Sequence, residues 1–306
     1  MKRVVSLSLG TSQRNKSAEI ELLGEKFLVE RIGTDGDMRK FAQLMAELDG
    51  QVDAFGVGGC DIYVAVGQRK YAFREILQLV KAAKRTPVVD GSGLKHTLER
   101  ETLKRLQASG EMNFADERVF LVSAVDRYGM AQTLDELCPN VVYGDLMTAL
   151  GLPIPILSYR AVETLGRLTL PLITQLPFKR LYPTGEKQNE RKPKFQKTFD
   201  WATTICGDSL YILRYAPDRL DGKTLITQSV RKANLEWFEK AGVQRVITTT
   251  PIVNGETFAT NVMEGVLVAL LGKQPAQITE QDYLDVLARL DWQPNVLRLQ
   301  APAASV

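Results

Sequence analysis

One histidine and three cysteines are the only imidazole and thiol groups in this chain of 306 residues. The cysteines, Cys60, Cys138 and Cys206, lie far apart and form no CxxC pair, which argues against a disulfide framework and a structural zinc site. The single histidine, His96, excludes a histidine-rich metal centre and any Ser-His-Asp triad that does not use it. We therefore expect no metal site, and a reducing, cytoplasmic setting.

The sequence also has little net charge of either sign. Its 39 Lys and Arg residues against 36 Asp and Glu give +3, so no overall field favours nucleic acid or an anionic membrane. The N-terminus lacks the apolar stretch of a signal peptide, and charged residues cut the apolar segments. We expect a small-molecule partner, no nucleic acid and no stable membrane insertion, and a homo-oligomer is left open.

What the sequence does contain is a regular alternation of Val- and Ile-rich runs with helical periodicity. This alternation predicts an α/β fold with a largely parallel sheet. The helix over 37–50 has the clearest signals, with Asp37 as its N-cap and Gly50 as its stop. The predicted strands cover 3–9, 25–33, 52–59, 86–93, the start of 118–137, 141–145, 203–208, 223–228 and 245–251, and the other predicted helices cover 71–85, 96–110, the end of 118–137, 234–242 and 261–272.

A polar stretch at 109–117 separates two sets of elements. We predict a smaller N-terminal α/β domain over 1–112, a Rossmann-like, mostly parallel doubly wound domain over 113–275, and a C-terminal helix and tail over 276–306. Residues 152–200 form an insertion, either a buried helical excursion or a lid or interfacial helix. Its basic part, 179–197, is either solvated surface or attracts a phosphate or carboxylate.

The stretch RVFLVSAVDRYGMAQTLDEL (118–137) predicts a buried strand, a tight turn and a helix. Compared with a GxxGxxG dinucleotide turn, it offers Ser123, Asp126 and Gly129 at the glycine positions. A carboxylate at Asp126 would repel a pyrophosphate, unless it caps the helix or binds a cation. Asp145 ends the next strand about 20 residues later, where an acid accepts ribose hydroxyls. The turn also supplies the cofactor candidates Ala124 and Tyr128.

Further candidates follow other predicted strands, at the edge where open α/β sheets bind ligands. Cys60 and Asp61 follow the strand at 52–59, as substrate-binding residues or as a tight loop with a small buried thiol. The segment 248–265 could orient a nicotinamide carboxamide, or its Thr260 and Asn261 could simply cap the next helix. The cofactor candidates outside the turn are Asp208, Thr249, Asn254 and Asn261.

Several segments together resemble a known family: VDGSGLKHTLER, VSAVDRYGMA, YPTGEKQ, DRLDGKTLIT and ITTTPIVNGETFATNVMEGVLVALLGK. They look like a bacterial group labelled quinate 5-dehydrogenase, similar to the shikimate and quinate dehydrogenases, over residues 3 to about 273. That family uses a Lys and an Asp as an acid/base pair, and the resemblance implies Lys95 as the lysine, with Asp126 as a second catalytic candidate. Ser92 and Gly93, in the glycine turn before Lys95, would hold a carboxylate substrate. The Asn-Thr, Pro-His-Lys and Asn-Thr-Asp motifs of the family are absent.

The resemblance implies an NAD- or NADP-dependent oxidoreductase of a small, anionic hydroxy metabolite, bound in a cleft between the domains. The alternative is a Rossmann-like ligand-binding or regulatory protein without redox chemistry, which the substituted glycines favour. A third interpretation is a peripheral membrane enzyme that uses residues 160–183 as its contact.

Overall fold

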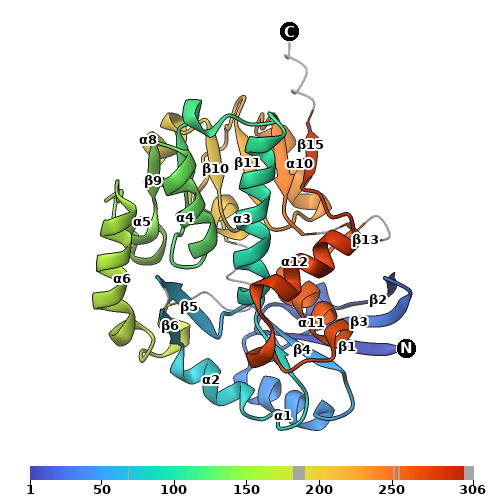
Figure 1. Cartoon of the computed structure of the whole chain (residues 1–306). Coiled ribbons are helices and arrows are strands. Elements are labelled where there is room, and N and C mark those ends of the chain that lie inside the picture. Colours follow the sequence, from blue (N-terminus) through green and yellow to red (C-terminus); the bar gives the residue numbers. More distant parts are fainter. Residues whose placement is uncertain (68, 182–189, 251, 254–255, 300–306) are drawn as a thin grey trace. The chain divides into compact units, whose positions relative to one another are not determined.

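The computed structural model describes residues 1–67, 69–181, 190–250, 252–253 and 256–299. The chain divides into two compact units, each with its own sheet (Figure 1). Its path crosses between them several times, twice within a helix: α3 (Ser92–Ala108) and α6 (Tyr159–Ile173). Unit 1 comprises Met1–Thr97, Leu168–Gln188 and Ile252–Trp292, and unit 2 comprises Leu98–Arg167, Asn189–Pro251 and Gln293–Val306.

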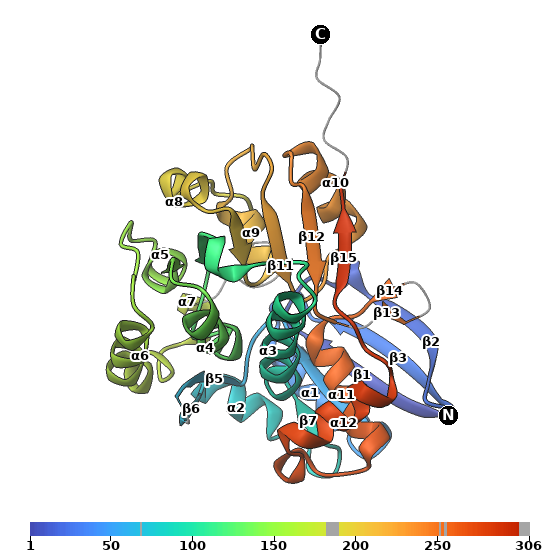
Figure 2. The same cartoon turned by 45° about the horizontal axis from the view of Figure 1, so that its top comes forward.

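Unit 1 is built on a five-stranded sheet in the order β2-β3-β1-β4-β7. Figure 2 labels β2, β3, β1 and β7 of this sheet. β1, β3, β4 and β7 are parallel, and β2 pairs antiparallel with β3 through a turn in which Leu23 and Gly24 have φ of 52° and 83°. Positive φ at both positions is typical of a type I′ hairpin turn. The elements are β1 (Lys2–Ser8), β2 (Lys16–Leu22), β3 (Glu25–Gly33), α1 (Met38–Leu48), β4 (Ala54–Gly58), β5 (Tyr63–Val66), β6 (Arg69–Ala72), α2 (Arg74–Val80), β7 (Val88–Val89), the first turns of α3, α7 (Phe178–Leu181), β13 (Ile252–Val253), β14 (Glu256–Thr257), α11 (Thr260–Leu271) and α12 (Glu280–Arg289), with short 3-10 turns at Ser12–Arg14 and Pro275–Gln277.

The late helix α11 packs on β1 and β4 of unit 1. Glycines permit the close approach: a Cβ at Gly56 would lie 2.7 Å from the Asn261 carbonyl oxygen, and one at Gly265 would lie 2.9 Å from Val4 Cγ1. The compact units therefore differ from the predicted domains over 1–112, 113–275 and 276–306, because α11 buries its apolar residues against the N-terminal strands.

Unit 2 has a six-stranded sheet in the order β15-β12-β11-β10-β8-β9, parallel except for the edge strand β15. Alternate residues of each strand enter separate cores on the two faces: Leu121 and Cys206 lie on one face, Phe120 and Ile205 on the other. This is the doubly wound, Rossmann-like α/β class that the sequence predicts. The elements are the 3-10 turn at Phe114–Asp116, β8 (Val119–Leu121), α4 (Tyr128–Leu137), β9 (Val141–Tyr143), α5 (Asp145–Leu150), α8 (Gln196–Trp201), β10 (Thr204–Cys206), α9 (Ser209–Tyr215), β11 (Thr224–Thr227), α10 (Lys232–Lys240), β12 (Arg245–Thr248) and β15 (Asn295–Arg298).

The strand order of unit 2 reverses between β8 and β10. From β8 the chain crosses through α4 to β9 on one side, and it later returns to β10 on the other side. In open α/β sheets, ligands bind at the carboxyl ends of the strands at such a switch point. The turn after β8 and the loop after β10 are therefore where a nucleotide site is expected.

Over the described residues, none of the helices combines the length and the apolar character that crossing a bilayer needs.

Candidate functional site

The carboxyl edge of the unit 1 sheet brings together a lysine and an aspartate that the sequence analysis singled out separately. Asp61 follows β4, and Lys95 lies in the first turn of α3, directly after β7. Lys95 Nζ lies 3.2 Å from Asp61 Oδ1, and the side chains are 8% and 19% exposed. The predicted lysine thus has a carboxylate beside it, and water still reaches the aspartate. The other catalytic candidate, Asp126, belongs to unit 2.

Asp90 holds this edge in place. Its Oδ2 accepts hydrogen bonds from the amides of Ile62 at 2.8 Å and Tyr63 at 3.0 Å, and its Oδ1 accepts one from the Ser92 amide at 3.0 Å. One buried carboxylate therefore ties the loop that carries Asp61 to the start of the helix that carries Lys95. Asp90 was not predicted as a site residue, although its position near the end of the predicted strand over 86–93 was a signal. Ser92, predicted to bind a carboxylate substrate, has its amide occupied by Asp90.

Cys60 is a buried thiol in a tight loop, as the structural interpretation of this segment expects. Burial raises the pKa of the Cys60 thiol well above its ordinary value, and the nearby charges of Asp61 and Asp90 raise it further. The thiol therefore stays protonated at neutral pH and is a poor nucleophile.

Gly93 serves packing in unit 1. A Cβ at this position would lie 2.4 Å from Glu264 Oε1 of α11. Glu264 is buried and accepts a 2.7 Å hydrogen bond from the hydroxyl of Tyr283 in α12. Burial raises the pKa of Glu264 to about 7, and Asp90 adds to the rise. The glycine thus makes room for a buried carboxyl group, and a substrate contact at Gly93 is not needed to explain it.

The turn after β8 is already filled by a carboxylate of the protein. Asp145 Oδ1 accepts hydrogen bonds from the amides of Ala124 at 2.9 Å and Val125 at 3.0 Å, and from the Ser123 hydroxyl at 3.3 Å. Burial raises the pKa of Asp145, and the Val125 and Ala124 amides partly oppose this. The side chain predicted to bind a ribose instead occupies two of the turn amides that a pyrophosphate would need.

The switch point between β8 and β10 holds a buried cluster of charges around Arg127, the N-cap residue of α4. Its guanidinium forms ion pairs with Glu99, with Asp126 at 3.0 Å and with Asp208 at 2.9 Å, and the Arg127 side chain is 3% exposed. Asp208 also accepts a 2.7 Å hydrogen bond from the side-chain amide of Gln228, after β11. Burial alone would lower the pKa of Arg127, but the three carboxylates raise it above its ordinary value.

This cluster bears on the two structural alternatives stated for Asp126, a helix cap or a cation ligand. Its carboxylate does not cap α4, since the N-cap is Arg127 without a side-chain cap bond, and the cation beside it is the Arg127 guanidinium. Arg127 and Glu99 were not predicted as site residues, because an arginine in a turn is usually solvated.

The remaining cofactor candidates are spread over both units. Tyr128 donates a 3.1 Å hydrogen bond to Glu163, Gly129 is buried in the first turn of α4, and the Thr249 amide donates to the Thr227 carbonyl at 3.0 Å. Asn254 lies outside the described residues.

Asn261 belongs to unit 1, where its side-chain amide donates a 2.8 Å hydrogen bond to Ser6 Oγ. The prediction that Thr260 or Asn261 caps this helix is wrong, because the N-cap of α11 is Ala259 and no side chain caps it. Both residues sit one position or more inside the helix, where Asn261 instead packs against the strands.

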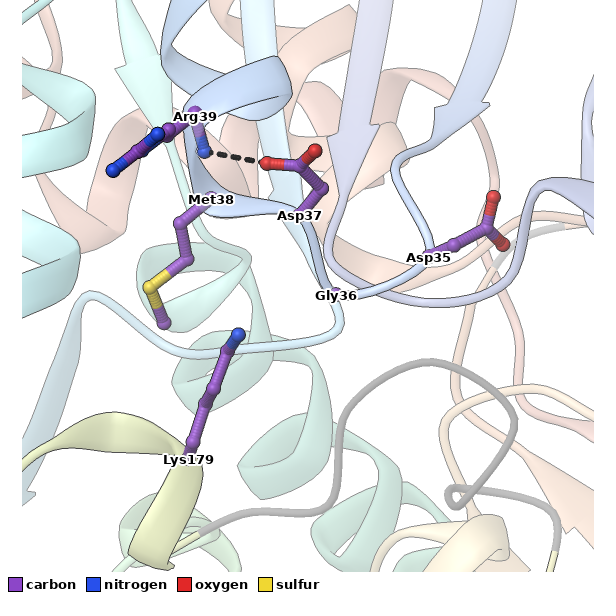
Figure 3. A pocket seen from close by; sticks show the side chains of 6 residues that line it. All are labelled: Asp35, Gly36, Asp37, Met38, Arg39 and Lys179. Carbon is purple, nitrogen blue, oxygen red and sulfur yellow. Dashed lines mark hydrogen bonds between the residues drawn. The ribbon is translucent and has the colours of Figure 1, made fainter.

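A pocket of about 460 Å³ lies at the other end of the unit 1 edge, beside the first turn of α1 (Figure 3). Asp37 is the N-cap of α1, as predicted, and bonds the Arg39 amide at 2.8 Å. Lys179 of α7 extends toward the same turn (Figure 3). The lining is Asp35, Gly36, Asp37, Met38, Arg39 and Lys179. Opposite charges alternate around this pocket, so no single charge of ligand is favoured.

The predicted basic segment 179–197 lies partly outside the described residues, since 182–189 are not covered. Of its described part, Arg191 forms a 3.0 Å ion pair with Asp218 and stacks over Trp237 at 4.3 Å from the ring centre. Lys192 pairs with Glu190 at 2.9 Å. These charges have partners within unit 2, which favours the surface interpretation over an anion site.

Solved structures similar to the chain show low identity. A malic enzyme from Entamoeba histolytica is 10% identical, with a TM-score of 0.41 over 94% of this chain and 62% of that one. A hetero-hexameric glutamate dehydrogenase from Thermus thermophilus is 12% identical, with a TM-score of 0.41 over 95% and 74%. A periplasmic solute-binding protein of an ABC transporter from Actinobacillus succinogenes is 12% identical, with a TM-score of 0.34 over 97% and 98%.

No curated protein matches the chain. Two family models do: residues 3–90 match Domain of unknown function (DUF8753), and residues 93–299 match Domain of unknown function (DUF8754). The two matches meet at the start of α3, near the first boundary between the compact units. Because the second match covers more than half of the sequence, the chain belongs to the family described as Domain of unknown function (DUF8754).

Proposed function

We propose that the protein is an enzyme that moves a proton to or from a hydroxyl group of a small, polar, anionic metabolite at the carboxyl edge of unit 1. Lys95 and Asp61 are the proposed proton-transfer pair. The observation that carries the proposal is their 3.2 Å separation in a largely buried setting at the strand ends. Sheet edges of this kind bind ligands, and a lysine held by a carboxylate can exchange protons there.

In this proposal the two side chains have different tasks. The Lys95 ammonium faces the substrate oxygen, stabilises negative charge that develops on it and delivers the proton; in the opposite direction the neutral amine of Lys95 removes the proton. Asp61 orients the ammonium and accepts a proton through water, since its side chain keeps some exposure. Asp90 is a positioning residue, because it fixes the loop of Asp61 against the start of α3.

The resemblance to shikimate and quinate dehydrogenases supports a finer form of the proposal, in which NAD or NADP accepts a hydride from the same substrate. The turn after β8 does not fit the pyrophosphate of such a cofactor as it stands. Asp145 occupies the amides of Ala124 and Val125, and its negative charge would repel a phosphate. We therefore assign no step to a nicotinamide cofactor.

The hydrogen bonds that Asp145 accepts from the Ala124 and Val125 amides also favour a second function. If the turn after β8 is permanently closed by Asp145, unit 2 is a Rossmann-like scaffold without a dinucleotide. The protein would then carry out acid–base chemistry or ligand binding without redox change.

Two titrations test these proposals. Thermal shift with a panel of hydroxy carboxylates, including quinate and shikimate, should show a saturable rise in melting temperature for the wild type. Lys95→Met should lose it, and Lys104→Met, an exposed lysine of the same helix, should keep it. Loss in both variants, or no response of the wild type to any member of the panel, would contradict the proposed site.

Titration with NADH and NADPH, followed by nicotinamide fluorescence, separates the two functions. Saturable binding at micromolar to millimolar cofactor supports the redox form. An unchanged signal up to millimolar cofactor, with the hydroxy-acid response intact, supports the second function.

A further inference from the structure

A buried glutamate of unit 1 lies against the turn that carries Lys95. Glu264, in the second turn of α11, is 3% exposed. A Cβ added at Gly93, two residues before Lys95, would lie 2.4 Å from Glu264 Oε1. The carboxyl group therefore fills the space beside the first turn of α3. Because interiors are close-packed, a movement of this carboxyl group also moves the start of α3.

The two oxygens of the Glu264 carboxyl group have different surroundings. Oε1 accepts a 2.7 Å hydrogen bond from the hydroxyl of Tyr283 in α12, which lies beside α11 in both views (Figures 1 and 2). Oε2 is buried and has no hydrogen-bond partner among the described residues. An ionised carboxylate with an unbonded oxygen in the interior is costly, because neither water nor a donor compensates its charge. The geometry therefore favours the protonated form of Glu264.

A second carboxylate lies near Glu264. The charge of Asp90, just before α3, acts on both Glu264 and Tyr283. Asp90 is buried and accepts hydrogen bonds from three backbone amides, which hold it in place. Burial and this neighbouring charge raise the pKa of Glu264 to about 7, and hydrogen bonds from Tyr283 and from turn amides partly oppose the rise. Ionisation of Glu264 would place two like charges in one buried region.

The cations on the elements that pack against α11 have other partners. Lys95 of α3 pairs with Asp61, and Arg31 of β3 donates hydrogen bonds to the loop after β1 and to the end of that strand. β4 and β7 consist of uncharged residues. Histidine side chains ordinarily titrate between pH 5 and 8, so His96, in the second turn of α3, needs a control of its own.

We propose that Glu264 is a positioning residue for Lys95 that holds the first turn of α3 in place in its protonated form, so that the Lys95–Asp61 site releases its ligand as the pH rises. This regulation rests on the function proposed above for the two residues. When Glu264 ionises, Asp90 repels it, and the carboxylate is stabilised by moving toward water. The movement displaces the turn at Gly93 and separates Lys95 from Asp61.

The pH dependence has a definite direction. The protonated form of Glu264 predominates below pH 7 and the ionised form above it. Because only the protonated form positions Lys95, the apparent dissociation constant of the ligand rises as that form is lost, by about tenfold between pH 6 and pH 8. A hydroxy acid is itself a carboxylate throughout this range, so its own titration does not cause the change.

Isothermal titration calorimetry of the full chain with quinate at pH 6, 7 and 8 tests the proposal. The wild type should bind about tenfold more weakly at pH 8 than at pH 6, whereas the two values for Glu264→Gln, which cannot ionise, should agree within about twofold. His96→Gln should keep the pH dependence of the wild type. Equal pH dependence in the wild type and Glu264→Gln overturns the proposal, and so does its loss in His96→Gln.

Tyr283→Phe supplies a second, independent variant. It removes a hydroxyl that favours the ionised form of Glu264, so the midpoint of the pH dependence should move to higher pH. If Tyr283 and Glu264 served stability alone, the substitution would lower the melting temperature and leave the midpoint unchanged. An unchanged midpoint therefore overturns the proposal.

Hydrogen–deuterium exchange of the Lys95 amide needs no ligand and separates a failure of this proposal from a failure of the proposed function. The amide donates a 2.7 Å hydrogen bond to the Gly91 carbonyl in the first turn of α3. After correction for the intrinsic rate at each pH, its protection should fall from pH 6 to pH 8 in the wild type and stay constant in Glu264→Gln. Constant protection in the wild type overturns the regulation even where quinate binds. A fall in protection without binding of any hydroxy acid supports the pH-dependent hold on α3 and contradicts the proposed function.

Discussion

In each unit the carboxyl ends of the parallel strands lie at one edge of that unit's own sheet. The charged side chains at these two edges have different partners. In unit 2, Arg127 and Asp145 turn inward, and each binds groups of its own fold. In unit 1, Lys95 and Asp61 pair beside each other with the aspartate still reached by water. The same architecture thus uses its charges for folding in one unit and, in our proposal, for chemistry in the other.

The two edges differ in which carboxylate accepts hydrogen bonds from the backbone amides at the strand ends. A helix that follows a parallel strand presents free amides at the strand end, and some anion must satisfy them. Asp145 does so in unit 2 by reaching back from the next strand, so an external phosphate has less to bind. In unit 1, Asp90 satisfies the corresponding amides, and its neighbour in space, Asp61, is left for Lys95.

The largest expected effect is the loss of the buried cation of unit 2. Arg127→Met should lower the free energy of unfolding by about 3–5 kcal/mol, because the carboxylates of Glu99, Asp126 and Asp208 lose the charge that compensates them. Urea unfolding at pH 7 measures it. Arg219→Met, at the exposed pair with Asp221, is the control and should change nothing measurable. Equal effects of both substitutions would show that the cluster does not stabilise unit 2.

The next effect concerns pH and the buried Glu264 of unit 1. Its pKa is raised to about 7 from an ordinary 4.5, so the folded chain holds this proton more tightly than the unfolded chain. Protonated Glu264 contributes roughly 3 kcal/mol to the free energy of unfolding below pH 4.5. This contribution is lost as the pH rises through 7. Glu264→Gln should therefore flatten the decline in stability between pH 4.5 and 8, as measured by urea unfolding. Glu236→Gln, on the surface, should leave the decline unchanged, and an unaltered slope in Glu264→Gln would refute the assignment.

A third substitution opens the turn of unit 2 to an external anion. Asp145→Ala leaves the amides of Ala124 and Val125 without their acceptor and should cost about 1–3 kcal/mol. Added inorganic phosphate should restore part of the melting temperature of the variant and leave the wild type unaffected. If the wild type binds NADH and Asp145→Ala abolishes that binding, Asp145 is a ribose ligand after all and the comparison between the units fails.

Local pattern was enough to predict most of the elements. The strand over 25–33 and the N-cap Asp37 were predicted as the structure has them, because alternation and capping are local signals. The hairpin strand β2 was missed, since its turn uses Leu23 and Gly24 where the usual signal is Asn-Gly or Asp-Gly. The edge strand β15 was missed as well, in a segment assigned to a tail.

The sites were harder to predict, because long-range pairing decides which charge meets which. Lys95 was selected and its need for a carboxylate was foreseen, but the identity of that carboxylate depends on how β4 and β7 align. Asp145 was predicted to end its strand, but β9 ends at Tyr143 and Asp145 is the first residue of α5. Its side chain points inward and accepts hydrogen bonds from the turn amides. Glu264 gave no signal, since a glutamate in an apolar helix is read as a surface residue until the burial of the whole helix is known.

Removal of the Lys95 charge from unit 1 should destabilise the protein much less than removal of the Arg127 charge from unit 2. Lys95→Met should change the stability of unit 1 by about 1 kcal/mol or less, because it leaves one carboxylate, Asp61, that water can still solvate. Removal of Arg127 leaves three carboxylates without their cation. The loss in free energy of unfolding should therefore be larger for Arg127→Met than for Lys95→Met. A double-mutant cycle of Lys95→Met with Asp61→Asn, followed by urea unfolding, gives the coupling directly. A coupling as large as the loss in Arg127→Met would mean that the unit 1 pair also holds the fold together, whereas a small coupling combined with complete loss of the hydroxy-acid response is the behaviour of residues retained for chemistry.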